Sequence, residues 1–165
     1  MIPKTVNCDP FTLERLNLLA NNPQRGNKTR YQLTDDHTHS KITTLREETP
    51  EKPYWILITH STVNTHESST SLPDGIPSDY DAPTILEAAT TILTHYVRSG
   101  TWLYDEGHIY CKEERSERNT NLTIAMGKTS TNSLQIYSKK STVTRFQEAI
   151  VPPSRMGMAL LRRLA

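Results

Sequence analysis

Two segments of the chain carry apolar residues at the spacing of an α-helix. Residues 11–20 form an apolar stripe after Asp9-Pro10, a capping carboxylate followed by a proline suited to the first helical turn. Residues 81–83, Asp-Ala-Pro, repeat this start, and apolar positions three or four apart continue towards Gly100. The pattern predicts one helix that ends near residues 21–23 and a second helix over 83–97.

Strands are predicted from apolar runs and from alternation. The most hydrophobic run is residues 54–59, and its β-branched and aromatic content predicts a central strand packed by the 83–97 helix; this strand contains Trp55, Ile56, Leu57 and Ile58. Shorter runs predict further strands at 31–33, 42–45, 102–104, 108–111, 122–126, 134–136 and 143–150. The Asp-Glu-Gly turn at 105–107 joins two of these strands in a predicted hairpin.

The end of the chain predicts a third helix. Ser154 can cap it, and its apolar side would consist of Met156, Leu160, Leu161 and Leu164. Residues 66–80 have no sustained apolar period, which predicts an exposed loop.

Composition sets the expected fold class. The polar excess is mainly uncharged Thr, Ser and Asn, which favours a sheet with one solvent-exposed face. We expect a single α+β domain over residues 1–165. Its mainly antiparallel sheet would have about five to seven strands, layered with about three helices.

Positive charge is concentrated in the basic C-terminal third, residues 118–165. Eight Lys and Arg side chains face one acid there, Glu148, a balance of +7; the whole chain sums to +1, which leaves −6 for residues 1–117. This division favours an acidic partner, such as nucleic acid, an anionic membrane or an acidic protein surface. The alternative is that the basic third folds against the acidic part of its own chain and is neutralised there.

Basic residues interleaved with an aromatic on an open sheet can follow a phosphate backbone and stack a base. The residues expected to bind nucleic acid in this way, RNA included, are Lys128, Tyr137, Lys139, Lys140, Arg145, Arg155, Arg162 and Arg163. The other interpretation is a solvated face whose lysines protect an edge strand.

The function expected from these patterns is a non-enzymatic binding or structural protein. Its ligand would be nucleic acid, another polyanion or an acidic protein surface, and homo-oligomerisation is left open. The composition, rich in Thr, Ser and Asn and without a catalytic motif, is typical of small viral accessory or matrix-type proteins.

Histidine supplies the competing hypothesis, a histidine-dependent phosphodiesterase or nuclease. His37 and His39 form a His-x-His pair, and residues 137–140 have the Tyr-x-x-Lys spacing of some replication nucleases. The middle residue of the pair is Thr rather than a bulky apolar residue. His60 and His66 start two His-x-Thr/Ser motifs, but these are too close in sequence to form a two-sided site. We therefore expect no catalytic site, no metal and no cofactor.

Cysteine usage and the absence of long apolar runs bear on the compartment. Cys8 and Cys111 belong to no CxxC or Cys/His cluster and are expected to be free thiols. The first residues lack the apolar core of a signal peptide, and no apolar run approaches the ~18 residues that span a bilayer. We expect a cytoplasmic or nuclear protein that is not secreted.

Overall fold

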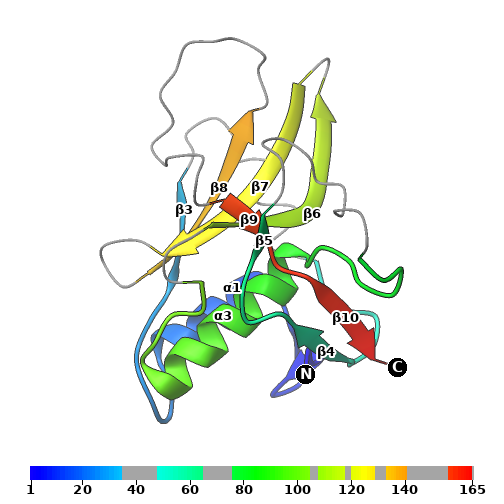
Figure 1. Cartoon of the computed structure of the whole chain (residues 1–165). Helices are drawn as coiled ribbons and strands as arrows, with labels where there is room; N and C mark the ends of the chain where they lie inside the picture. Colours follow the sequence, from blue (N-terminus) through cyan, green and yellow to red (C-terminus); the bar gives the residue numbers. More distant parts are fainter. Residues whose placement is uncertain are drawn as a thin grey trace.

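The computed structural model describes residues 1–34, 48–64, 76–104, 108–117, 120–128, 133–140 and 156–164, and within them it shows two helices and ten strands (Figure 1). Helix α1 spans Leu13–Asn21 and helix α3 spans Ile85–Ser99. The strands form three separate sheets. The predicted mixed α+β class is confirmed, whereas the predicted single sheet with about three helices does not match these elements.

The largest sheet has six strands and mixed direction. In spatial order its strands are β3 (Tyr31–Thr34), β8 (Leu134–Lys140), β7 (Thr120–Lys128), β6 (His108–Glu117), β9 (Met156–Met158) and β5 (Val63–Asn64). Pairing is antiparallel at β8–β7, β7–β6 and β9–β5, and parallel at β3–β8 and β6–β9. Strands β7 and β8 confirm the predictions at 122–126 and 134–136.

Two small antiparallel sheets complete the described strands. Strands β1 (Thr5–Val6) and β2 (Asp9–Pro10) form one, and β4 (Trp55–Ile58) and β10 (Leu161–Leu164) form the other. We call the β4–β10 pair the ribbon. In Figure 1 the ribbon lies to the right of α3, with the C-terminus of the chain at its outer end.

The core lies between the two helices and the large sheet. Helices α1 and α3 lie side by side beneath that sheet (Figure 1). The best-buried apolar side chains of this layer come from α1, α3 and strands β6 to β8 and include Leu13, Leu16, Ile92, Leu93, Ile109, Met126 and Ile136. Burial of this shared core is what orients the helices against the sheet.

Helix α3 begins and ends where its sequence signals stand. Thr84 accepts a hydrogen bond from the backbone N–H of Glu87 (3.2 Å), and the Glu87 carboxylate accepts one from the backbone N–H of Thr84 (2.8 Å). This reciprocal capping box fixes the N-terminus. Gly100, at φ 74°, closes the C-terminus in the left-handed conformation. The predicted 83–97 helix is confirmed, with Thr84 rather than Asp81 as its cap.

The predicted start of the first helix is wrong. Asn7 and Cys8 have positive φ values of 53° and 69°, as the two central residues of a tight hairpin turn require. The turn returns Asp9-Pro10 along β1 as strand β2, so these residues cap no helix. Thr12 caps α1 instead and accepts a hydrogen bond from the N–H of Arg15 at 3.1 Å.

The most hydrophobic run forms a surface strand rather than a central one. Within the described part of the chain, β4 has β10 as its strand partner, and the exposed fractions are 60% for Trp55 and 52% for Leu57. Ile56 and Ile58 pack against the core. A run that is apolar at every position suggests burial on both faces, but only one face of β4 meets the helices.

The predicted C-terminal helix is also wrong. Residues 156–158 form β9 beside β6, and residues 161–164 form β10 beside β4. Pairing with β10 satisfies the backbone groups on one edge of β4. That tertiary gain outweighs the weak intrinsic helix preference of a short segment.

The remaining predictions are mixed. Residues 102–104 form no strand, and Tyr104 has a positive φ of 59°. The first strand of the predicted hairpin is therefore absent. Strand β6 instead continues through the charged residues 112–117. The predicted strands at 42–45 and 143–150, and most of the predicted 66–80 loop, lie outside the described residues.

Alanine substitution of two leucines should distinguish a buried core position from an exposed position on the ribbon. Leu93→Ala removes a side chain with 0% exposure and should lower the free energy of unfolding by about 2–5 kcal/mol. Leu57→Ala is the matched change at an exposed site and should cost no more than about 0.5 kcal/mol. Urea unfolding followed by circular dichroism measures both. Equal losses would contradict the surface position of Leu57.

Candidate binding surface

The sequence-predicted nucleic-acid residues are divided among several strands. Lys139 and Lys140 lie on β8 opposite Thr123 and Leu122 of β7, and Tyr137 lies opposite Ala125. Lys128 pairs in register with Leu134, six residues along β7 from the Leu122 position, which is about 20 Å. Arg145 and Arg155 lie outside the described residues. Lys139 and Lys140 are consecutive on β8, and the strand register separates both of them from Lys128.

The two C-terminal arginines lie on β10, in a different sheet, and each meets an acid. Arg162 Nε lies 2.8 Å from Asp79 Oδ2. Arg163 forms a two-pronged contact with Glu87, Nε to Oε1 at 2.7 Å and Nη2 to Oε2 at 2.8 Å. Its Nη1 also lies 3.4 Å from Asp81 Oδ2. These two residues therefore behave as the alternative predicts, because each pairs with acids from the first 117 residues of the chain.

Glu87 is the centre of a charged cluster beneath the ribbon. Its side chain is fully buried, and Tyr54 donates a hydrogen bond from its hydroxyl to Glu87 Oε1 at 2.9 Å. Burial would raise the pKa of Glu87, but hydrogen bonds from Arg163, the Thr84 N–H and Tyr54, together with the Arg163 charge, hold that pKa below its ordinary value. Burial and the neighbouring Glu87 charge raise the pKa of Tyr54 to about 12.

Asp81 extends this cluster towards β6. Its carboxylate pairs with Lys112 and Arg163 and accepts a hydrogen bond from the Ala82 N–H at 2.9 Å. Partial burial would raise the pKa of Asp81, but Lys112 and the other donors lower it overall. The backbone of Asp81 also exchanges two hydrogen bonds with Leu161, both 2.8 Å. These contacts fasten β10 to the start of α3 and show the cluster's role in the fold.

The outward side of the ribbon is exposed and largely apolar. In the ribbon, Trp55 pairs with Leu164 and Leu57 pairs with Arg162, and residues directly opposite share a face. We call Trp55, Leu57, Arg162 and Leu164 the outer ribbon face. The opposite face, with Leu161 and Arg163, meets α3. The sequence did not reveal this surface, because the apolar run at residues 54–59 is typical of a core strand.

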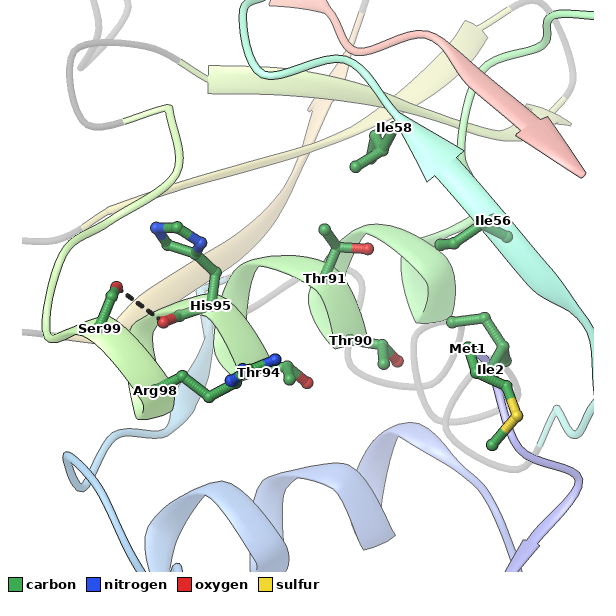
Figure 2. A pocket seen from close by; sticks show the side chains of 10 residues that line it. All are labelled: Met1, Ile2, Ile56, Ile58, Thr90, Thr91, Thr94, His95, Arg98 and Ser99. Atoms are coloured by element: carbon green, nitrogen blue, oxygen red, sulfur yellow. Dashed lines mark hydrogen bonds between the residues drawn. The ribbon is translucent and has the colours of Figure 1, made fainter.

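A groove of about 520 Å³ separates the inner edge of β4 from α3 (Figure 2). Ile56 and Ile58 line it from the strand, and threonines line it from the helix. His95 and Arg98 lie towards the C-terminal end of α3 in Figure 2. A second pocket, of about 270 Å³, lies between α1 and α3 and is mostly apolar. The lining of the larger groove combines an apolar wall with a positively charged end.

The remaining candidate chemistry can be placed only in part. His60 is exposed, whereas His37, His39 and His66 lie outside the described residues. Among the described side chains, no group of three His, Cys, Asp or Glu could hold a metal ion. Cys8 is exposed and Cys111 is buried, and neither forms a disulfide. The helices that the structure describes are too short or too polar to cross a bilayer.

Comparisons of the chain with protein-family models, with characterised proteins and with solved structures find no match. The described geometry offers two features that no internal contact explains: the apolar side chains of the outer ribbon face and the groove beside β4.

Removal of the Glu87 charge should destabilise the fold. Glu87→Gln leaves Arg163 without its carboxylate partner and should cost about 3 kcal/mol at neutral pH. Asp79→Asn breaks the half-exposed pair with Arg162 and should cost less than about 1 kcal/mol. Chemical denaturation measures both variants. A loss for Asp79→Asn as large as that for Glu87→Gln would contradict the special position of Glu87.

The same carboxylate predicts a pH dependence. Because the pKa of Glu87 is lower in the folded chain than in the unfolded chain, its stabilising contribution is complete above the unfolded pKa and is lost as pH falls through the folded pKa. The free energy of unfolding should therefore decrease below about pH 4.5. Glu87→Gln should flatten this decrease. An unchanged slope in the variant would assign acid unfolding to other carboxylates.

Proposed function

We propose that this protein is a non-enzymatic binding protein that contacts another protein through the outer ribbon face. The observation that carries the proposal is the exposure of Trp55, at 60%, and Leu57, at 52%, on a paired strand. Adjacent large apolar side chains on a surface mark interaction sites more often than isolated ones do. Tryptophan in particular is enriched among the residues that dominate binding energy.

The surroundings of these side chains support a protein partner. Arg162 and Asp79 form an ion pair beside the apolar pair, which resembles the polar rim of a protein interface. The inner face of the ribbon is held by the contact of Arg163 with Glu87, so the outer face is supported by a fixed backbone. A partner would bind a preformed surface, so little conformational entropy would be lost in ordering that surface.

Site-specific photo-cross-linking tests this proposal. A photoreactive phenylalanine analogue in place of Trp55 should form a discrete protein adduct in the cells that make the protein. The same analogue at Leu18, a leucine with the same 52% exposure as Leu57 but on α1, is the matched control. Leu57→Asp should abolish the adduct at position 55. Equal adducts at both positions, or none at position 55, would contradict the proposal.

Nucleic acid is the second candidate ligand. It is supported by the register of the large sheet, in which Leu122 of β7 pairs with Lys140 on one side and with Arg115 on the other. Two basic residues, Lys140 and Arg115, therefore lie at one level of the sheet, two strands or about 10 Å apart. Lys139 lies at the next level, opposite Thr123. Glu114 shares that level with Lys139 and limits the net charge there.

Fluorescence anisotropy with labelled single- and double-stranded oligonucleotides at several salt concentrations tests this candidate. Each phosphate contact should contribute a log–log salt slope of about −0.7 for single strands. Lys139→Glu with Lys140→Glu should weaken binding across sequences, because phosphate contacts carry no sequence information. Lys4→Glu with Lys52→Glu makes the same charge change at exposed positions elsewhere. Equal effects of the two pairs would indicate only a response to net charge.

A further inference from the structure

The alternation of hydrogen bonds along β4 determines which of its backbone N–H and carbonyl groups face β10 and which face the opposite edge. The N–H of Thr59 donates to the carbonyl of Leu160 at 3.0 Å, so the odd-numbered residues of β4 face β10. Tyr54 exchanges hydrogen bonds with Ile2 on the opposite edge, at 2.8 and 3.1 Å. In an antiparallel ladder alternate residues bond to opposite sides. The N–H and carbonyl groups of Ile56 and Ile58 therefore point to the same edge as those of Tyr54.

This edge is covered at one end only. Ile2 meets β4 at Tyr54, and within the described part of the chain no backbone group bonds to Ile56 or Ile58 along the edge. Two donors and two acceptors are thus available over about 7 Å of strand. Such an edge is a template for an added strand.

The groove lies beside this edge. Its volume of about 520 Å³ is within the range of ligand sites. Ile56 and Ile58 face Thr91 and His95 of α3 across it (Figure 2). A strand added to β4 would place every second side chain on the groove side. The site therefore combines a backbone edge with space for alternate side chains.

The charge of the groove indicates the chemistry of its occupant. Its lining includes Arg98 and His95 and no Asp or Glu. Arg98 is exposed, and among the described residues no carboxylate forms an ion pair with it. A carboxylate on the occupant would complement this cation, whereas a basic segment would be disfavoured.

We propose that the free edge of β4 binds an extended acidic peptide segment of a partner protein as an added antiparallel strand, with alternate side chains in the groove and a carboxylate near Arg98. The inference rests on the proposal that the ribbon contacts another protein, and it specifies the form of the contact and the chemistry of the partner. The segment would continue the line of Ile2 along β4.

A defined peptide pair tests the inference on the full chain. The probes are acetyl-Glu-Val-Thr-Val-Thr-amide and its Gln counterpart, titrated into ¹⁵N-labelled protein and followed by NMR. The Glu peptide should slow amide hydrogen exchange at Ile56 and Ile58 by about tenfold or more. Leu57 is the internal control, because its amide already faces β10. Failure of both peptides to protect Ile56 and Ile58 would overturn the inference.

Two comparisons separate edge binding from simple groove filling. Arg98→Gln should lower the affinity for the Glu peptide about fivefold and leave the affinity for the Gln peptide unchanged, as expected for an exposed ion pair. N-methylation of the two valines should affect binding differently from N-methylation of the two threonines, because only one alternate set of amides faces β4. Equal effects of the two methylated sets would overturn strand addition.

Other outcomes distinguish this inference from the proposed function. A peptide that shifts the Trp55 indole but leaves the amides of Ile56 and Ile58 unprotected binds the outer ribbon face; the edge inference then fails while the proposed function stands. Protection of the two amides by peptide, without any adduct at position 55, supports the edge and contradicts the outer-face contact. Protection in the free protein that disappears on dilution identifies a second copy as the occupant and overturns the peptide proposal.

Discussion

The contact between Glu87 and Arg163 is the interaction on which the arrangement of the ribbon depends. Glu87 closes the capping box of α3, and Arg163 belongs to β10, 76 residues further along the chain. Tyr54, at the start of β4, donates to the same carboxylate. One buried acid therefore ties a helix terminus to both strands of the ribbon, and the charged partners offset the cost of burying it.

Local sequence signals predicted the elements that depend mainly on interactions between residues close in sequence. The helix over 83–97 follows from its apolar spacing and from Gly100, and β7 follows from strict alternation over 122–126. The prediction that Asp9-Pro10 begins the first helix was wrong because these residues follow a hairpin turn. The turn residues Asn7 and Cys8 have positive φ values, but neither is a glycine, so the sequence gives no signal for the turn. The C-terminal helix was predicted wrongly because the strand partners of this segment, β6 and β4, are remote in sequence.

The candidate sites were less predictable than the fold, for a related reason. Charge along the sequence identified Arg162 and Arg163 as basic but not that Asp79, Asp81 and Glu87 would meet them. The run from Trp55 to Ile58 is apolar at every position, which sequence patterns cannot distinguish from a core strand. The groove requires Ile2, Ile56 and α3 to come together, and no single segment carries that information.

The distance in sequence between the two strands of the ribbon has a consequence during synthesis. Thr59 and Leu160 are 101 residues apart, yet they bond to each other at the end of the β4–β10 ladder. At about 5–20 residues per second, a ribosome needs several seconds or more to deliver β10 after β4 has emerged. During that interval the nascent chain carries a bare apolar strand with no partner on the β10 side. Such a segment is a target for chaperones and a nucleus for aggregation.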